Sequence, residues 1–157
     1  MMYKTMMAGL LLAAGTAPAL AEEAPAPIKT KSGEVGAAPT DQGQIVFFRP
    51  GSIMGGALGC TVREIQNGSE AQVARLGSGK YFAVTAAPGK HQYFTKGEAT
   101  DRLNLEVEAG ETYFVKCNIA MGVVAGRANL SPSDRATFAK KAGSLKLWAG
   151  GTKDDDK

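Results

Sequence analysis

Residues 88 to 121 constrain the fold more than any other part of the sequence, because they predict three consecutive β-strands joined by two turns. In the middle strand Leu103, Leu105 and Val107 alternate with polar residues, which gives one apolar and one polar face. The strands on either side begin after glycine-containing turns and continue into aromatic residues. Short strands at this spacing indicate antiparallel β-structure.

The same pattern of short strands and turns extends along most of the chain. Asn67-Gly68 indicates a tight hairpin, because both positions tolerate positive φ. The strand at 44–49 is apolar on both faces, which suits a strand covered on both sides. The predicted fold is mainly β, an antiparallel β-sandwich of about seven or eight strands with one short C-terminal α-helix. The predicted strands are 44–49, 60–66, 71–76, 80–86, 91–96, 102–107 and 112–120, with a further short strand considered at 128–130.

The C-terminal helix is predicted from its start and stop signals. Ser131 stands at the expected N-cap and Pro132 at the first helical position. Gly143 is expected to end the helix, and Phe138 to anchor it on the sheet. The apolar residues that follow predict either a last strand or a packing tail.

The N-terminus has the pattern of a secretory signal peptide. Lys4 is followed by an apolar run at 6–15, and Ala19-Leu20-Ala21 has the small-x-small form of a cleavage site after Ala21. The run is shorter than the roughly 20 apolar residues that a membrane span needs. Glu22 stands where a lipid anchor would require cysteine. We therefore expect an exported periplasmic protein with no membrane span or lipid anchor, secretion outside the cell remaining open.

Four regions are predicted: a signal peptide at 1–21, a flexible linker at 22–42, a β-sandwich domain at 43–149 and a disordered polar tail at 150–157. The linker is rich in Ala, Pro, Gly and charge, so it buries too little surface to offset its ordering entropy. A partner-binding peptide is the alternative for this segment. Cleavage after Ala21 would lower the formal net charge from +3 to +2 by removing Lys4. Without a basic cluster we expect no nucleic-acid partner, and the net charge gives no strong attraction to an anionic membrane.

The two cysteines, Cys60 and Cys117, are expected to form one disulfide. An exported chain with two cysteines favours this pairing, and strand parity places both on apolar faces, where a bridge between two sheets would lie. Two free buried thiols are the alternative. A redox motif is not expected without Cys-x-x-Cys.

No catalytic residue, metal ligand or cofactor site is predicted. The single histidine, His91, follows a turn and is expected to be half exposed. Glu106 and Glu108 lie on the solvent face of one strand, about 7 Å apart by strand geometry. Such a separation would suit an envelope hydrolase with paired carboxylates, and this is the alternative function.

Two glycine-rich apolar segments, 52–59 and 122–127, form the candidate contact surface, here called the rim. Arginines flank them and are expected to pair with Glu64 or Asp134, or else with a ligand. Partly exposed apolar side chains there would mark an interaction site. The proposed rim residues are Arg49, Ile53, Met54, Val123, Val124 and Arg127.

An ordered set of short motifs resembles the bacterial domain-of-unknown-function family numbered 2846. The motifs are Phe-Phe-Arg-Pro-Gly-Ser at 47–52, Gly-Lys-Tyr-Phe at 79–82, Pro-Gly-Lys-His at 88–91, Ala-Gly-Glu-Thr-Tyr-Phe-Val at 109–115, and Met-Gly with Gly-Arg at 121–127. The resemblance covers about residues 43 to 130 and implies an exported β-sandwich module. It implies no activity, so no catalytic residues follow from it.

We therefore expect a binding or envelope-associated structural protein and not an enzyme. Its partner would be an envelope protein or a small ligand. A purely structural protein without a ligand is the third hypothesis.

Overall fold

The computed structural model describes residues 23–53, 56–123 and 126–150. The predicted signal peptide with Ala21, the rim residues Met54 and Val124, and the tail beyond Gly150 lie outside these residues. In chain order the elements are β1 (Ile28–Thr30), β2 (Gly33–Val35), β3 (Gly43–Arg49), β4 (Cys60–Gln66), β5 (Ser69–Leu76), β6 (Lys80–Ala86), β7 (Gly89–Thr95), β8 (Asp101–Val107), β9 (Thr112–Ala120), β10 (Arg127–Ser133), α1 (Arg135–Ala142) and β11 (Lys146–Leu147).

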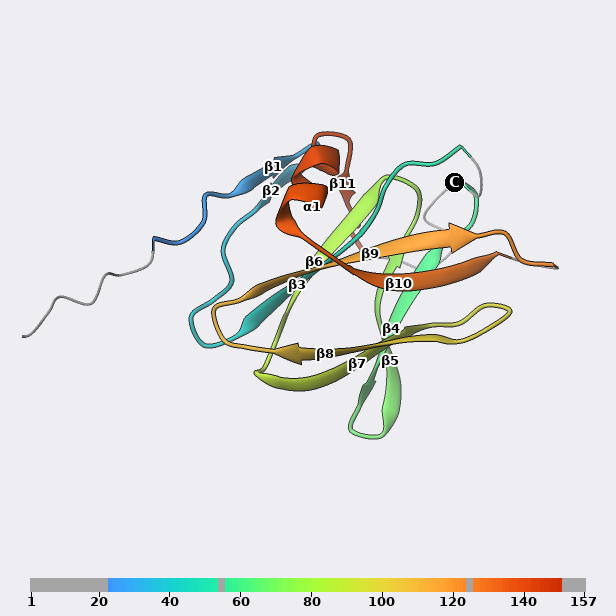
Figure 1. Cartoon of the computed structure of the whole chain (residues 1–157), viewed down its shortest axis with the longest axis horizontal. Coiled ribbons are helices and arrows are strands. Elements are labelled where there is room, and N and C mark those ends of the chain that lie inside the picture. Colours follow the sequence, from blue (N-terminus) through green and yellow to red (C-terminus); the bar gives the residue numbers. More distant parts are fainter. Residues whose placement is uncertain (1–22, 54–55, 124–125, 151–157) are drawn as a thin grey trace, which may run out of the picture.

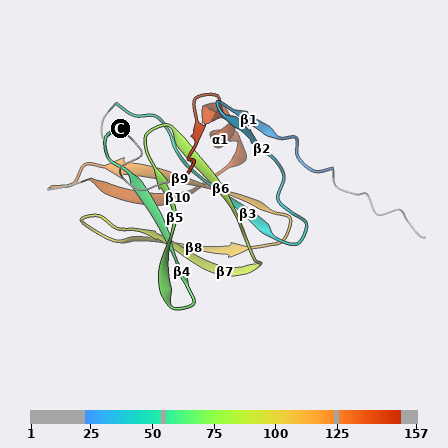
Figure 2. The same cartoon turned by 180° about the vertical axis from the view of Figure 1, so that it is seen from behind.

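The strands form two main sheets and a small hairpin. One sheet has the order β10-β9-β3-β6-β11, the other has the order β5-β4-β7-β8, and β1 pairs with β2. Helix α1 and the hairpin lie together on the outer side of the five-stranded sheet (Figure 1), and the reverse view shows the same arrangement (Figure 2). The mainly β prediction with one short C-terminal helix is confirmed. Most pairings are antiparallel, but β3 with β9 and β6 with β11 are parallel.

Strand β3 is buried on both faces, as its sequence predicts. Ile45 and Phe47 point into the core between the sheets, where the Phe47 ring meets Tyr93 edge-on at a centroid distance of 5.0 Å. Val46 and Phe48 point the other way, into a second core beneath α1 and the hairpin. Strand β3 therefore has one face in each core, and its neighbours β6 and β9 also contribute side chains to both cores.

The predicted disulfide is confirmed. Cys60 at the start of β4 is bonded to Cys117 in β9, with Cα atoms 6.5 Å apart, and the bond links the two sheets. Both cysteines belong to the inter-sheet core, together with Val62 and Val115. The parity argument from the sequence therefore placed both sulfur atoms on the correct faces.

The linker prediction is wrong for residues 28–35, which form the β1–β2 hairpin. Ile28 and Val35 are buried against Phe138 in the second core. The hairpin is also bonded to the C-terminal segment, because the Lys31 N–H donates to the Leu145 carbonyl at 3.0 Å. Ile28 and Val35 anchor this otherwise polar segment, because they pack on the apolar surface of the second core.

The predicted helix start is wrong by three residues. Strand β10 continues through Pro132 to Ser133, and proline is tolerated there because β10 is an edge strand. The N-cap is Asp134, whose carboxylate accepts the Thr137 N–H at 2.7 Å. This hydrogen bond is the main cause that lowers the pKa of Asp134. Helix α1 then ends at Ala142 as predicted, with Phe138 fully buried as its anchor.

We expect the disulfide to contribute up to about 4 kcal/mol to the free energy of unfolding, since it closes a long loop in the unfolded chain. Reductant should lower the denaturation midpoint of the wild-type protein and leave a Cys60→Ala/Cys117→Ala variant unchanged. Chemical denaturation with and without reductant measures both. A midpoint for the wild type that does not respond to reductant would contradict the bond.

The hairpin should contribute measurably to stability. Ile28→Ala and Val35→Ala should each lower the free energy of unfolding by about 1–3 kcal/mol, because each removes buried apolar surface. Lys29→Ala and Glu34→Ala, at exposed positions of the same hairpin, are the matched controls and should change it by less than about 0.5 kcal/mol. Equal effects from all four variants in denaturation curves would restore the flexible-linker interpretation.

Candidate functional site

The two rim segments lie at the same end of the molecule. Figures 1 and 2 both show the β3–β4 connection, the β9–β10 connection and the β7–β8 turn gathered there. The segments also touch: a Cβ atom at Gly126 would lie 2.4 Å from Cδ1 of Leu58, so only glycine allows this contact. The two segments, which are distant in the sequence, therefore meet at Leu58 and Gly126.

The apolar side chains of the rim are exposed. Relative exposure is 102% for Ile53 and 91% for Val123, and the flanking Met121 is 74% exposed. Leu58 is also exposed, at 39%. Elsewhere among the described residues, the only large apolar side chains that are exposed to solvent are Ile65 and Leu147. Exposed apolar residues thus concentrate at the rim, and Ile53 and Val123 meet the condition on which the contact-surface hypothesis depends.

An acidic residue from the β7–β8 turn holds the second rim segment in place. The Glu98 carboxylate accepts the Arg127 Nε–H at 3.1 Å and the Val123 backbone N–H at 3.1 Å. The ion pair that was expected for Arg127 therefore exists, but its partner is Glu98 instead of Glu64 or Asp134. This partner carries no signal in the sequence, because only the sandwich brings the turn next to the rim.

Arg49, at the end of β3, holds the first rim segment through Leu58. Its side chain is buried, and Nη1 donates to the carbonyl oxygens of Leu58 and, at 3.4 Å, Leu76. Burial lowers the pKa of this guanidinium from its ordinary value. The two acids proposed as its partners are engaged elsewhere, Glu64 with His91 and Asp134 with the start of α1. These contacts support the interpretation that the arginine pins a loop.

A basic pocket of about 270 Å³ adjoins the rim on the outer side of the five-stranded sheet. Lys116 of β9, Lys141 of α1 and Arg49 line it, and none of the described lining residues is acidic. The other lining residues are Pro50, Gly51, Ser52, Cys117, Asn118 and Ile119.

His91 is partly exposed, as the sequence suggests, and lies in β7, where it forms a partly buried ion pair with Glu64. Its Nδ1 lies 2.6 Å from Glu64 Oε1, and its Nε2 lies 2.8 Å from the Ala87 carbonyl oxygen. The Ala87 carbonyl oxygen can only accept, so Nε2 donates to it, and a protonated ring can also donate from Nδ1 to the Glu64 carboxylate. Burial lowers the pKa of His91, but the bonds to Glu64 and Ala87 outweigh it and the net pKa is raised.

The His91–Glu64 pair lies beside the inter-sheet core. The His91 ring stacks on the buried Tyr93, and burial together with the Glu64 charge raises the pKa of that phenol. Both acid and base line a groove of about 670 Å³ between the two sheets. Their polar atoms bond one another or neighbouring groups, and the pair links the adjacent strands β4 and β7.

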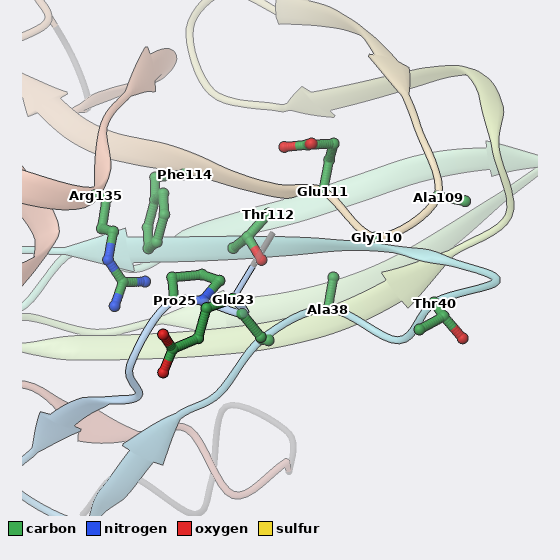
Figure 3. Close-up of a pocket in the computed structure, with 12 residues that line it drawn as sticks. Glu23, Pro25, Ala38, Thr40, Ala109, Gly110, Glu111, Thr112, Phe114 and Arg135 are labelled. Atoms are coloured by element: carbon green, nitrogen blue, oxygen red, sulfur yellow. The ribbon is translucent and has the colours of Figure 1, made fainter. Parts of the chain in front are cut away.

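Two further pockets contain acidic residues. Figure 3 shows a pocket of about 480 Å³ beside the β8–β9 turn, in which the carboxylates of Glu23 and Glu111 extend toward opposite sides of the view. Glu106 lines a pocket of about 470 Å³ next to His91, whereas Glu108 is not among its lining residues. The Glu106 and Glu108 pair proposed for a hydrolase is thus not brought together in either pocket.

The described part of the chain contains no cluster of metal ligands and no helix that could span a membrane. There, no group of three or more His, Cys, Asp or Glu side chains could hold a metal ion. Helix α1 has only eight residues, and no described helix has the length and apolar character of a membrane span.

The raised pKa of His91 predicts a specific pH dependence of stability. A folded-state pKa above the ordinary value of 6.5 means that the pair stabilises the fold fully below about pH 6.5. This contribution is lost as the pH rises through the folded-state pKa. His91→Gln should therefore remove the decrease in unfolding free energy between neutral and mildly alkaline pH, and His91 chemical shifts in an NMR titration should report the raised pKa. A parallel decrease in wild type and variant would contradict the assignment.

The comparisons with known proteins identify a family but no characterised relative. No curated protein and no solved structure matches the chain. One family model, described as a protein of unknown function (DUF2846), matches residues 39–129, which is more than half of the 157 residues. The match contains the disulfide and both rim segments, and the resemblance found in the sequence motifs is confirmed. The chain belongs to the DUF2846 family of proteins of unknown function.

Proposed function

We propose that this protein is an exported binding module of the bacterial envelope that makes its contact through the rim. One observation carries the proposal: Ile53, Val123 and Met121 project from two adjoining loops at exposures of 74% or more. Contiguous exposed apolar side chains tend to mark interaction sites. The loops are held by Arg49, Glu98 and Arg127, so the contact surface is presented by a rigid scaffold.

Export is supported by two independent features. The N-terminal sequence has the charge, apolar run and cleavage pattern of a signal peptide. The Cys60–Cys117 bond belongs to the chemistry of oxidising compartments, such as the periplasm. We expect the mature protein to begin at Glu22, and mass spectrometry of protein from a periplasmic fraction tests this. An intact N-terminus on the purified protein would contradict it.

A binding role fits the geometry better than hydrolysis does. A carboxylate pair needs two acids that converge on one cavity, and Glu106 and Glu108 do not line a common pocket. The His91–Glu64 pair has its polar atoms engaged in hydrogen bonds. The exposed apolar surface lies at the rim, away from both sets.

The contact surface can be tested by site-specific photo-cross-linking in living cells. A benzophenone amino acid at Ile53 should give covalent adducts with a protein or lipid. The same probe at Ile65, another exposed apolar residue far from the rim, is the matched control. Adducts from both positions, or from neither, would overturn the rim assignment.

Arg127→Ala provides a second test, because it removes the ion pair that holds the loop but no apolar side chain. We expect fewer adducts from position 53 or 123 at unchanged thermal stability. An unchanged adduct set would exclude Arg127 from the site.

A further inference from the structure

We propose that β6 accepts an additional β-strand along its open edge, and that this strand is an extended segment of another protein. The segment has apolar residues at alternate positions and acidic residues at its ends. The edge is separate from the rim, so the inference goes beyond the proposed function and does not depend on it. It follows from unpaired backbone groups, from the groove beside the edge and from the charges at its two ends.

Strand β6 is paired on both sides only at its beginning. On one side β3 pairs with it along its whole length, from Lys80 to Ala86. On the other side β11 pairs with Lys80 and Tyr81 alone, and the last bond runs from the Trp148 N–H to the Tyr81 carbonyl oxygen at 2.8 Å. Beyond Tyr81 no described residue bonds to this side of β6. Residues 82–86 therefore form an open sheet edge, here called the β6 edge.

Strand geometry identifies which backbone groups are free. The Tyr81 carbonyl points away from β3, because it accepts the Trp148 N–H. Backbone groups alternate in direction along a strand, so Ala83 and Thr85 direct their N–H and carbonyl groups to the same side as Tyr81. These two residues offer two donors and two acceptors in the spacing of a β-ladder. Only another extended chain satisfies all four groups together.

The features that usually protect a sheet edge are missing from this one. Residues 81–86 contain no charged residue and no proline, and the register of β6 on β3 has no irregularity. Strand β5, the edge of the other sheet, is different. It carries Glu70 and Arg75, and its register on β4 is irregular. Charges and bulges discourage the pairing of an edge with another chain, so β6 is the edge that is left able to accept a strand.

An apolar groove of about 670 Å³ lies beside the β6 edge, between the two sheets. Phe82 and Val84 of β6 line it together with Val73 of β5, and all three side chains are only partly buried. On β3, which β6 covers, Ile45 and Phe47 are completely buried. An added strand would direct every second side chain over this groove. It would thus bury the apolar surface that β6 leaves open.

The charges around the β6 edge select an acidic partner. Glu64 is the only acidic residue among those that line the groove, and its carboxylate is bonded to His91. Lys90 is exposed at the end of the groove, and no described residue forms an ion pair with it. At the other end Lys80 and Lys146 are neighbours in the β6–β11 register. The edge is therefore uncharged between two basic ends, which match acidic residues at the ends of the partner segment.

The same charges disfavour a second copy of this chain as the partner. Antiparallel pairing that joins Ala83 of one copy to Thr85 of the other would place Lys80 opposite residue 88 of the other copy. Lys90 of that copy would then lie close to Lys80 and Lys146. Like charges would meet at both ends of the paired strands, whereas an acidic segment brings opposite charges there.

The test selects binders of the mature protein from a library of random nine-residue peptides. We expect the enriched peptides to alternate apolar and polar residues and to carry acidic residues at their ends. Thr85→Pro should weaken their binding, measured by calorimetry, by about tenfold or more, because it removes an outward donor. An edge strand tolerates proline on its solvent side. The matched control Thr85→Val keeps the donor and should stay within about twofold, and thermal unfolding checks that each variant folds.

The charge requirement is measured with the same peptides. Lys90→Glu should weaken binding by about threefold or more and reduce its dependence on salt. Lys29→Glu makes the same change of charge at an exposed position on the β1–β2 hairpin and should have no effect.

Hydrogen exchange of the wild-type protein gives an independent measurement. In the free protein the Ala83 and Thr85 amides should exchange rapidly, whereas the Phe82 and Val84 amides, bonded to β3, should be protected. A saturating peptide should slow exchange at Ala83 and Thr85 by about tenfold or more. Absence of any enriched peptide, binding that leaves these two amides unprotected, or equal affinity for Thr85→Pro would overturn the inference.

Photo-cross-linking in living cells separates this inference from the proposed function. A benzophenone amino acid at position 85 should give adducts with another protein, and a self-adduct would overturn the assignment of the partner. Ile65 alternates with the buried Glu64 along β4, so its side chain lies on the opposite face of that sheet and serves as the control here too. Adducts from position 53 without adducts from position 85 would overturn this inference alone, and the reverse result would overturn the proposed function alone.

Discussion

The double burial of β3 is the constraint on which the rest of this structure depends. In a strand with one apolar face, a shift of one residue exposes the apolar side chains, so hydrophobic pattern alone fixes the register. Strand β3 lacks this safeguard because both faces are apolar. Contacts at the two ends of β3 constrain its register instead. A Cβ atom at Gly43 would lie 2.2 Å from Val107 Cγ1, and at the other end Arg49 donates to the carbonyl oxygens of Leu58 in the β3–β4 connection and Leu76 in β5. Both contacts disfavour a shift of β3 along its neighbours.

The same end of β3 creates the rim. After Arg49 the chain must leave the five-stranded sheet and enter β4 of the other sheet, where Cys60 is immediately bonded to Cys117. The intervening loop is thus fixed at both ends. The β9–β10 connection is held by Glu98, which bonds Arg127 and the Val123 N–H.

Much of this architecture could be predicted from local sequence patterns. Alternation and turn residues located the strands from 44 to 120 to within about two residues, within the usual uncertainty of element boundaries, and parity located the disulfide. What could not be predicted depends on contacts between distant segments. The Glu98–Arg127 pair requires knowledge of which turn meets the rim. To predict the His91–Glu64 pair one must know the register of β4 on β7. The pairing of β4 with β5 shifts between Val62 and Arg63, so simple alternation along β4 does not give that register. Ile28 and Val35 appear isolated in a polar segment, and only the apolar surface formed by Phe48 and Phe138 gives them a place to pack.

The second core has a consequence for the order of assembly. Its cover consists of the hairpin at residues 28–35 and the helix at 135–142, both outside the 39–129 that match the family model. A chain synthesised from its N-terminus delivers the hairpin first and the helix last. The inter-sheet core, which draws its buried residues from Ile45 to Leu130, can close earlier. Until the helix emerges, Val46 and Phe48 lack the part of their cover that Phe138 and Ala142 provide, and the outer face of β3 is partly open to water.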